Sequence, residues 1–371
     1  MNLALKELRR RPGRFSVATV ILTLIAVLLM FLGGLLDGLI AGSTGALRAQ
    51  QGDLIVFSST SQDSLVRSRI DPEVKRKVES VNGVESAGGL GSVQLGGRLA
   101  GRGPRDLVPI VLFGYESAPG GLPSTPPAPG EAWADDSLRS EGVEEGTVIR
   151  LGPARSPVKV VGFVSDTRYS GQSTLWGSLP TWRAVQNQNR PDASTGPGVT
   201  QALVVESDGI GATALADAID KATGGVTSTL TVAQSIDALP GVSSQQSVFN
   251  QIIGITIVIA IIVVALFFAL ITVERIGLYG VLKALGAGSG TLFAGVLLQA
   301  VIVTLIACGI GALAGLVLDV LIPPGSIPFS LSAGRVLGSS FSRLLAAGLG
   351  GALPPRRGLR THPATARGRA Q

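Results

Sequence analysis

The chain has 371 residues, of which 46% are hydrophobic and only 15% are charged. Soluble domains carry about 25% charged residues, so this composition predicts a membrane protein. Of the 31 Lys/Arg and 25 Asp/Glu residues, 17 and 21 lie between residues 41 and 247, which gives that segment a net charge of −4 and leaves +10 for the rest. Nucleic-acid binders concentrate basic residues on a folded domain, so nucleic acid is not expected as a partner. Positive charge beside apolar runs is typical of cytoplasmic loops.

The first apolar run follows a basic amphipathic segment, residues 1–14, that we expect in the cytoplasm. The run from Phe15 to Leu36 contains 22 residues and no charge. A bilayer core requires about 20 helical residues, whereas the apolar region of a signal peptide has about 7–15. The sequence therefore predicts a retained transmembrane helix over residues 15–40.

Residues 41–247 are predicted to fold as an extracytoplasmic α+β domain between spans one and two. Asp53–Ser59 and Leu107–Glu116 have the pattern of strands, and Asp71 with Pro72 begins a helix whose valines share one face. A second strand–helix unit follows within residues 200–225. We expect a β subdomain at about 131–190 to separate these two strand–helix units.

Two further long apolar runs predict transmembrane helices over residues 248–273 and 291–322, joined by a cytoplasmic segment, 274–290. The spacing of Gly34 and Gly38 and of Gly311 and Gly315 would allow neighbouring helices to approach closely. That these glycines are merely tolerated, without such a contact, remains equally open.

A fourth, weaker span is predicted over residues 333–353. It carries Arg343 within the apolar run, which costs about 2.5–3.5 kcal/mol at the centre of a membrane helix. However, residues 354–371 form a basic tail that would lie outside the cell with only three spans, against the positive-inside tendency. We therefore expect four spans, with both termini in the cytoplasm of a multi-pass protein of the plasma (inner) membrane.

No catalytic, cofactor-binding or metal site is expected. The glycines of "GAGSG", residues 286–290, are not followed by the Lys of a phosphate-binding loop, and the single histidine, His362, has no nucleophile near it in the sequence. Cys308 lies in an apolar run and has no second cysteine to pair with. The adjacent carboxylates Asp135/Asp136 and Glu144/Glu145 are expected to be solvated loop charges. The chain is therefore not predicted to be an enzyme.

The segment after the second span has the pattern of a short amphipathic helix. Leu278, Leu282 and Leu285 share one face, and charged or polar side chains border it. Two interpretations remain open: a surface-lying turn between spans, or a docking helix for a soluble partner, which would recognise such a face.

The stretch "ERIGLYGVLKALGA" resembles the FtsX/MacB-like permease family of ABC transporters at the same position, after the second span. "LRRRPGRF" before the first span, the large domain after it and "HPATARGR" near the end resemble the same family. The resemblance implies a four-span permease that pairs as a homodimer or with a second permease in membrane lipid. A separate cytoplasmic ABC ATPase would bind ATP and Mg²⁺ and drive it. In this family the helix after span two contacts the ATPase, and carried over, the contact falls on Glu274, Arg275, Leu278, Tyr279, Leu282, Lys283 and Leu285.

Three functions remain open. The first is a transport permease of the mechanotransmission type, which relays closure of the ATPase to the outer domain to export or extract a lipophilic or bulky substrate. The second is an FtsX-type transmitter that transports nothing and regulates an extracytoplasmic enzyme such as a cell-wall hydrolase. The third, a membrane-anchored binding module without an ATPase, is disfavoured by the segment at 274–287. The size of the outer domain favours the first.

Overall fold

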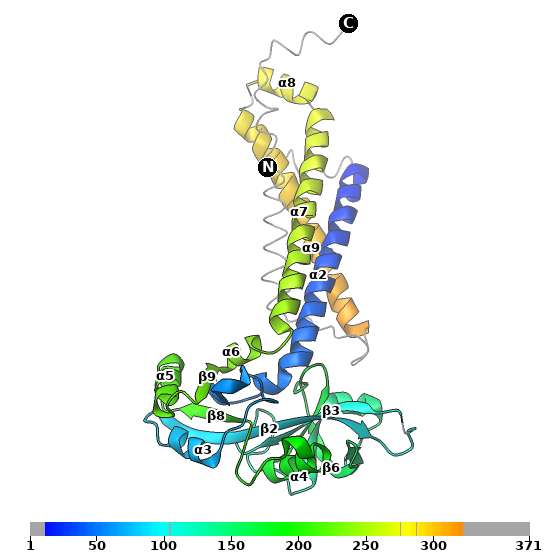
Figure 1. The fold of residues 1–371 in the computed structure, drawn as a ribbon. Coiled ribbons are helices and arrows are strands. Elements are labelled where there is room, and N and C mark those ends of the chain that lie inside the picture. The colour runs from blue at the N-terminus through cyan, green and yellow to red at the C-terminus, as the bar shows by residue number, and fades with distance from the viewer. Residues whose placement is uncertain (1–11, 104, 275, 287, 322–371) are drawn as a thin grey trace. The chain divides into compact units, whose positions relative to one another are not determined.

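The computed structural model describes residues 12–103, 105–274, 276–286 and 288–321. The fourth span at 333–353, the tail at 354–371 and most of the basic segment at 1–14 lie outside these residues. The chain divides into a helical unit, which includes Met1–Gly38 and Gln246–Pro323, and an α+β unit, Leu39–Gln245 (Figure 1).

The helical unit contains three described helices that are long and apolar enough to cross a membrane. These belong to α2 (Pro12–Arg48), α7 (Val242–Glu274) and α9 (Ser289–Leu321). Large apolar side chains on all three are exposed, such as Leu24 (64%), Leu266 (66%) and Leu313 (67%). A chain in water would bury much of this surface, whereas a bilayer solvates it. The structure thus supports an α-helical membrane protein with three described candidate spans.

The three long helices contact one another through apolar side chains. Ala26 and Leu29 of α2, Ile253 of α7 and Cys308 of α9 form one buried cluster. At Gly311 of α9, an added Cβ would lie 2.8 Å from the Cβ of Ala26, closer than real side chains pack. Of the two interpretations left open for Gly311, the structure favours a close helix approach, and it is made against α2.

One half of the α+β unit is a split strand–helix–strand arrangement. Strands β2, β8, β1 and β9 are neighbours in that order and all pair antiparallel. Helices α3 and α5 cover one face of this sheet, where Val78, Leu215 and Ile219 pack on its apolar residues. The elements are β1 (Leu54–Ser58), α3 (Pro72–Glu79), β2 (Val84–Arg98), β8 (Ala202–Ser207), α5 (Ala212–Ala222) and β9 (Thr227–Thr231), with η1 (Ser59–Ser61) after β1 and α6 (Val232–Asp237) after β9.

The other half is a closed ring inserted between β2 and β8. The far end of β2 pairs with both β3 and β5, which closes the order β2-β3-β7-β4-β6-β5 on itself. Apolar side chains fill the ring, and Trp182 and Val185 of α4 pack on them. The elements are β3 (Val108–Tyr115), β4 (Glu131–Asp135), η2 (Asp136–Glu141), β5 (Val148–Leu151), β6 (Ser156–Val164), β7 (Ser173–Ser178), α4 (Leu179–Asn189) and η3 (Pro191–Ala193).

The strand expected at Leu107–Glu116 exists as β3, but it belongs to the ring and not to the first strand–helix unit. The second strand of that unit is β2, whose glycine-rich sequence "VESAGGLGSVQLGGR" does not have the composition of a strand. At two positions of this strand, neighbouring side chains leave no room for a Cβ atom, so only glycine fits. An added Cβ at Gly88 would lie 2.0 Å from Ser117 Oγ, and one at Gly91 would lie 2.5 Å from the Trp182 ring.

The two halves share a further apolar core, which we call the junction core. It contains Ala46 and Leu47 from the end of α2, Leu239 from the segment before α7, Val242 from the start of α7, and residues of both β halves. Its centre is aromatic: Phe113 stacks on Trp176 with centroids 4.5 Å apart and meets the edge of Tyr169 at 5.3 Å. Burial raises the pKa of Tyr169 to about 12. The last turn of α2 and the first residue of α7 therefore pack in the same core.

We predict that Gly91→Ala destabilises the α+β unit by about 1–3 kcal/mol, because the new methyl group overlaps the Trp182 ring. All 3 tryptophans of the chain, Trp133 among them, lie in this unit, so tryptophan fluorescence during heating reports its unfolding. Gly196→Ala, where the nearest atom is 3.9 Å away, is the matched control. Equal melting temperatures for the two variants would contradict the packing described here.

Candidate functional site

The segment predicted to couple to an ATPase forms a short helix between two long ones. Helix α7 ends at Glu274, α8 spans Ile276–Ala284, and α9 begins at Ser289 (Figure 1). Gly286 has a φ of +92° and its N–H donates to the carbonyl of Lys283 at 3.1 Å. Glycine reaches this left-handed conformation without strain and is the usual residue just past the end of a helix. It ends α8 and lets the chain turn towards α9.

The structure places part of the predicted contact set. The side chains of Glu274 and Leu285 are exposed, that of Leu285 to 79%, and Lys283 is half-buried in the last turn of α8. Leu278, Tyr279 and Leu282 lie on α8, but their side chains and the whole of Arg275 lie outside what the structure describes. The sequence reading missed two exposed apolar residues of α8, Ile276 (50%) and Val281 (59%). Large exposed apolar side chains on such a short helix are typical of a binding surface. The contact with the ATPase stays a prediction.

A second candidate site lies in the α+β unit, where the end of α2 meets the loop between β6 and β7. We call residues 165–172 the clasp loop. The Ala46 N–H donates to the Arg168 carbonyl at 3.1 Å, and the Ser170 and Gly171 N–H groups donate to carbonyls of α2 at 3.0 Å. An added Cβ at Gly45 would lie 2.6 Å from the Asp166 carbonyl oxygen. The backbones can approach this closely only because residue 45 has no side chain.

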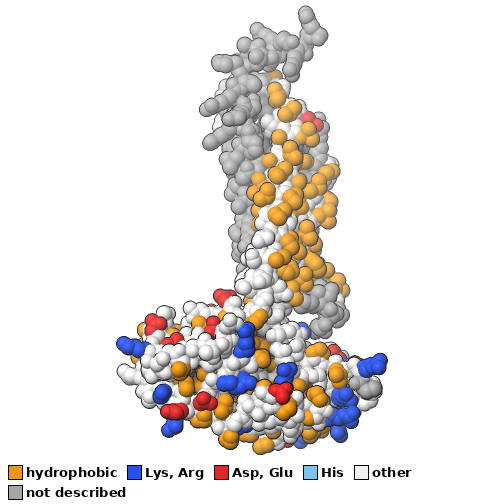
Figure 2. Space-filling view, in the orientation of Figure 1, with side chains coloured by type: hydrophobic (Ala, Val, Ile, Leu, Met, Phe, Trp, Pro, Cys, Tyr) orange, Lys and Arg blue, Asp and Glu red, His pale blue; other side chains and the backbone are white. Residues whose placement is uncertain are grey.

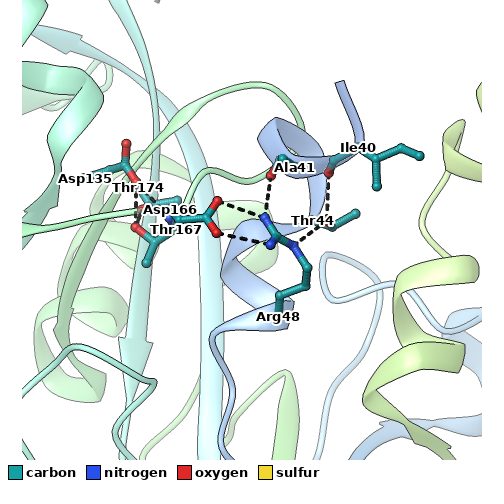
Figure 3. A network of polar contacts seen from close by, with 8 residues as sticks. All are labelled: Ile40, Ala41, Thr44, Arg48, Asp135, Asp166, Thr167 and Thr174. Carbon is teal, nitrogen blue, oxygen red and sulfur yellow. Dashed lines mark hydrogen bonds and ion pairs between the residues drawn. The ribbon is translucent and has the colours of Figure 1, made fainter. Parts of the chain in front are cut away.

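The Arg48 side chain joins the helix to the same loop (Figure 3). Its Nη2 and Nη1 donate to the two carboxylate oxygens of Asp166 at 2.9 and 3.1 Å, and its Nε donates to Thr44 Oγ1 at 3.1 Å. The side chains of Arg48 and Asp166 are 39% and 65% exposed, and such pairs contribute only about 0–1 kcal/mol. The ion pair therefore orients the helix end, and the backbone contacts hold it.

On its other side the clasp loop is tied to the ring by Asp135, at the end of β4. This carboxylate is only 2% exposed and accepts hydrogen bonds from the N–H of Thr167 at 2.9 Å and from its hydroxyl at 2.8 Å. The same hydroxyl contacts Thr174 Oγ1 of β7 at 2.9 Å. The expectation that Asp135 is a solvated charge is wrong, because the loop it binds is distant in sequence and covers it.

The neighbouring carboxylate, Asp136, binds the first residue of the clasp loop. The hydroxyl of Ser165 donates to it, and this hydrogen bond is the main reason that the pKa of Asp136 lies below its usual value, with Arg139 adding to the effect. A continuous set of contacts thus runs from α2 through the clasp loop into β4 and β7. The described residues contain no cluster of His, Cys, Asp or Glu that could hold a metal ion.

We predict that Gly45→Ala opens the clasp, because the new methyl group would overlap backbone atoms of Asp166 and Arg168 that cannot rotate away. The amides of Ala46, Ser170 and Gly171 should then exchange with deuterium at least tenfold faster in the full-length protein.

Gly42→Ala is the matched control for this prediction. It raises helix propensity by the same amount, about 1 kcal/mol, but meets only the end of the Arg168 side chain at 3.9 Å. If both variants exchange alike, the close approach at Gly45 is not what holds the loop.

Comparisons with known proteins agree with the arrangement of helices. Residues 250–363 match the model of the FtsX-like permease C-terminal family. The HrtB protein of Staphylococcus haemolyticus strain JCSC1435, named as the permease protein of a hemin transport system, is 22% identical over 353 residues, covering 91% of this chain and 90% of that protein.

Two solved structures resemble part of the chain. The periplasmic region of MacB from Actinobacillus actinomycetemcomitans has a TM-score of 0.37 and 12% identity, covering 53% of this chain and 96% of that one. The extracellular domain of the ABC-type transporter YknZ from Gram-positive bacteria has a TM-score of 0.33 and 12% identity, covering 48% and 98%.

The family match begins in α7 and runs through α8 and α9, the same segment in which "ERIGLYGVLKALGA" carries the resemblance noted in the sequence. The relative matches over nearly its whole length, α+β unit included. Residues 250–363 therefore match the FtsX-like permease family, and the chain is similar over nearly its whole length to a permease protein of a transport system.

Proposed function

We propose that the chain is the permease subunit of a mechanotransmission ABC transporter. A separate cytoplasmic ATPase binds ATP and Mg²⁺, its closure moves the segment at 274–290, and the long helices pass this movement to the α+β unit outside the membrane. The observation that carries the proposal is the continuity of two helices. Helix α2 includes both Gly38, the last residue of the helical unit in this stretch, and Leu39, the first of the α+β unit, and α7 likewise includes both Gln245 and Gln246.

The proposal requires that a displacement at the membrane end of these helices reaches their other end. The end of α2 is held by the clasp loop and by Ala46 and Leu47 in the junction core, and the start of α7 enters the same core through Val242. Movement of either helix therefore acts on packed, hydrogen-bonded contacts rather than on a flexible linker. This is the property that a mechanical transmitter requires.

The proposed substrate is a lipophilic or bulky molecule that is exported or extracted from the membrane. The name of the HrtB relative concerns hemin, a large and largely apolar molecule, which supports this class. The permease is proposed to work as a pair, either of two copies or with a second permease. An FtsX-type transmitter would share the coupling but move no substrate, so substrate transport by the reconstituted complex distinguishes the two.

We predict that Leu282→Asp abolishes assembly with the ATPase. If α8 docks in a groove of that protein, the new carboxylate is buried without a partner, which commonly costs about 3–5 kcal/mol. The permease itself should still insert and fold, because residue 282 lies in the loop between spans. Co-purification and ATP hydrolysis by the complex measure the effect.

Arg275→Ala, closer to the predicted rim of this contact, should weaken assembly less. If the Leu282→Asp protein retains its ATPase at wild-type stoichiometry and turnover, α8 is only a surface turn between spans.

We also predict the membrane topology, from the charge of −4 on the central segment and +10 elsewhere. Single cysteines placed near positions 100, 140 and 200 should react with a membrane-impermeant maleimide from outside the cell, and those near 5, 286 and 365 only from inside. The native Cys308 is first replaced by Ser. Labelling of position 365 from outside would refute the four-span arrangement, with Arg343 as the reason that the last span does not insert.

A further inference from the structure

The ring of the α+β unit has an exposed face where β2, β3, β5 and β6 lie side by side. Strand register places Arg98 opposite Arg150 and Arg150 opposite Pro157. Leu107, just before β3, lies over Gly96 of β2, since an added Cβ at Gly96 would be 3.0 Å from Leu107 Cδ1. Their neighbours along the strands, such as Ile149 and Leu151, point into the ring and are fully buried. We call this surface the arginine face, consisting of Arg98, Leu107, Val148, Arg150 and Pro157.

The arginine face places two like charges directly across from each other. Cross-strand partners have Cβ atoms about 4.5–5.5 Å apart, and like charges at this distance destabilise a sheet. Among the described residues, neither Arg98 nor Arg150 forms an ion pair, whereas Lys159 on the adjacent strand is neutralised by Glu131. A sheet that keeps an unfavourable pair on its surface is typical of a binding site, where a ligand of opposite charge compensates the repulsion.

Further arginines surround this face. Arg155 lies in the turn between β5 and β6, and Arg190 donates from Nη2 to the carbonyl of Gln94, on β2, at 3.1 Å. Figure 2 shows Lys and Arg side chains over the α+β unit, with a group of them towards its right-hand end. The arginines named here belong to a segment whose net charge is −4, so their positive charge is a local feature of that segment. Guanidinium groups bind carboxylates through two parallel hydrogen bonds, which the ammonium of lysine cannot do.

The apolar residues distinguish between possible ligands. Leu107 and Val148 are 43% and 45% exposed and flank the two arginines. A simple polyanion or a lipid headgroup would use the charges and leave these side chains in water. A protein surface brings carboxylates and apolar side chains together, and protein interfaces are enriched in arginine around an apolar centre.

We propose that the arginine face binds an acidic segment of a second protein outside the membrane. Carboxylates of that segment lie against Arg98 and Arg150, and an apolar side chain of it packs on Leu107 and Val148. The location outside the membrane rests on the proposed function.

The test places a photoreactive benzophenone residue at position 107 of the full-length chain, in the cells that naturally make it. Irradiation should give an adduct with one protein, and mass spectrometry should locate the crosslink in a segment rich in Asp and Glu. The same residue at position 210, exposed elsewhere on the unit, should not give this adduct.

Arg98→Glu separates binding from folding. It replaces the repulsive pair by an opposite-charge pair across the strands, so the melting temperature should stay equal or rise. The adduct should nevertheless fall at least tenfold, because the partner's carboxylates now meet a carboxylate. Arg76→Glu, on the exposed surface of α3, changes the net charge equally and should leave the adduct unchanged.

The proposal is overturned by a lipid adduct, by no adduct, by a partner segment without excess acidic residues, or by an adduct that survives Arg98→Glu. These outcomes leave the permease proposal intact as long as maleimide labels a position near 100 from outside. Labelling of that position only from inside would instead refute the topology on which both proposals rest.

Discussion

The contact on which the α+β unit depends most is the approach of two backbones at Gly45. At this point the last turns of α2 touch the clasp loop so closely that even a methyl group has no room. The loop is in turn fixed to the ring by the buried carboxylate of Asp135. Here the helix end, the loop and two strands form one hydrogen-bonded assembly, and the junction core fills the space behind it with the aromatic side chains of Phe113, Tyr169 and Trp176.

The sequence predicted those elements whose own residues carry the signal. The long apolar runs, the short helix after the second of them, and strands such as β1 and β8 follow from composition and periodicity. Strand β2 could not be recognised in the same way. Two of its glycines are required because the side chains of Ser117 and Trp182, which are distant in sequence, leave no room for a Cβ atom. The clasp was equally hidden: Asp135 has the appearance of a solvent-exposed loop charge until Thr167, in a different connection, covers it. Long-range packing decides both cases, and no local pattern encodes it.

The segment at 274–290 was predicted to contact an ATPase from a family resemblance, which is carried mainly by the stretch "ERIGLYGVLKALGA". The likeness to FtsX-like permeases rests on residues 250–363 and on a relative that matches nearly the whole chain. Periodicity alone left both a docking helix and a surface turn open. The exposed Ile276 and Val281 are apolar residues of α8 that were not predicted as part of the contact. The two candidate sites therefore differ in kind. One is an exposed surface that we propose binds a partner, and the other is a packed contact within the α+β unit.

The pairing of β1 has a consequence for the order in which the chain folds. This strand follows α2 directly, yet its partners are β8 and β9, which are synthesised only after the whole ring. Contacts between segments so far apart in sequence form slowly, because a long loop must close first. β1 is therefore an apolar strand whose two edges stay unpaired while the ring is completed. An unpaired apolar strand is prone to aggregate, so in the proposed topology this interval is the stage of biogenesis at which an extracytoplasmic chaperone would matter most.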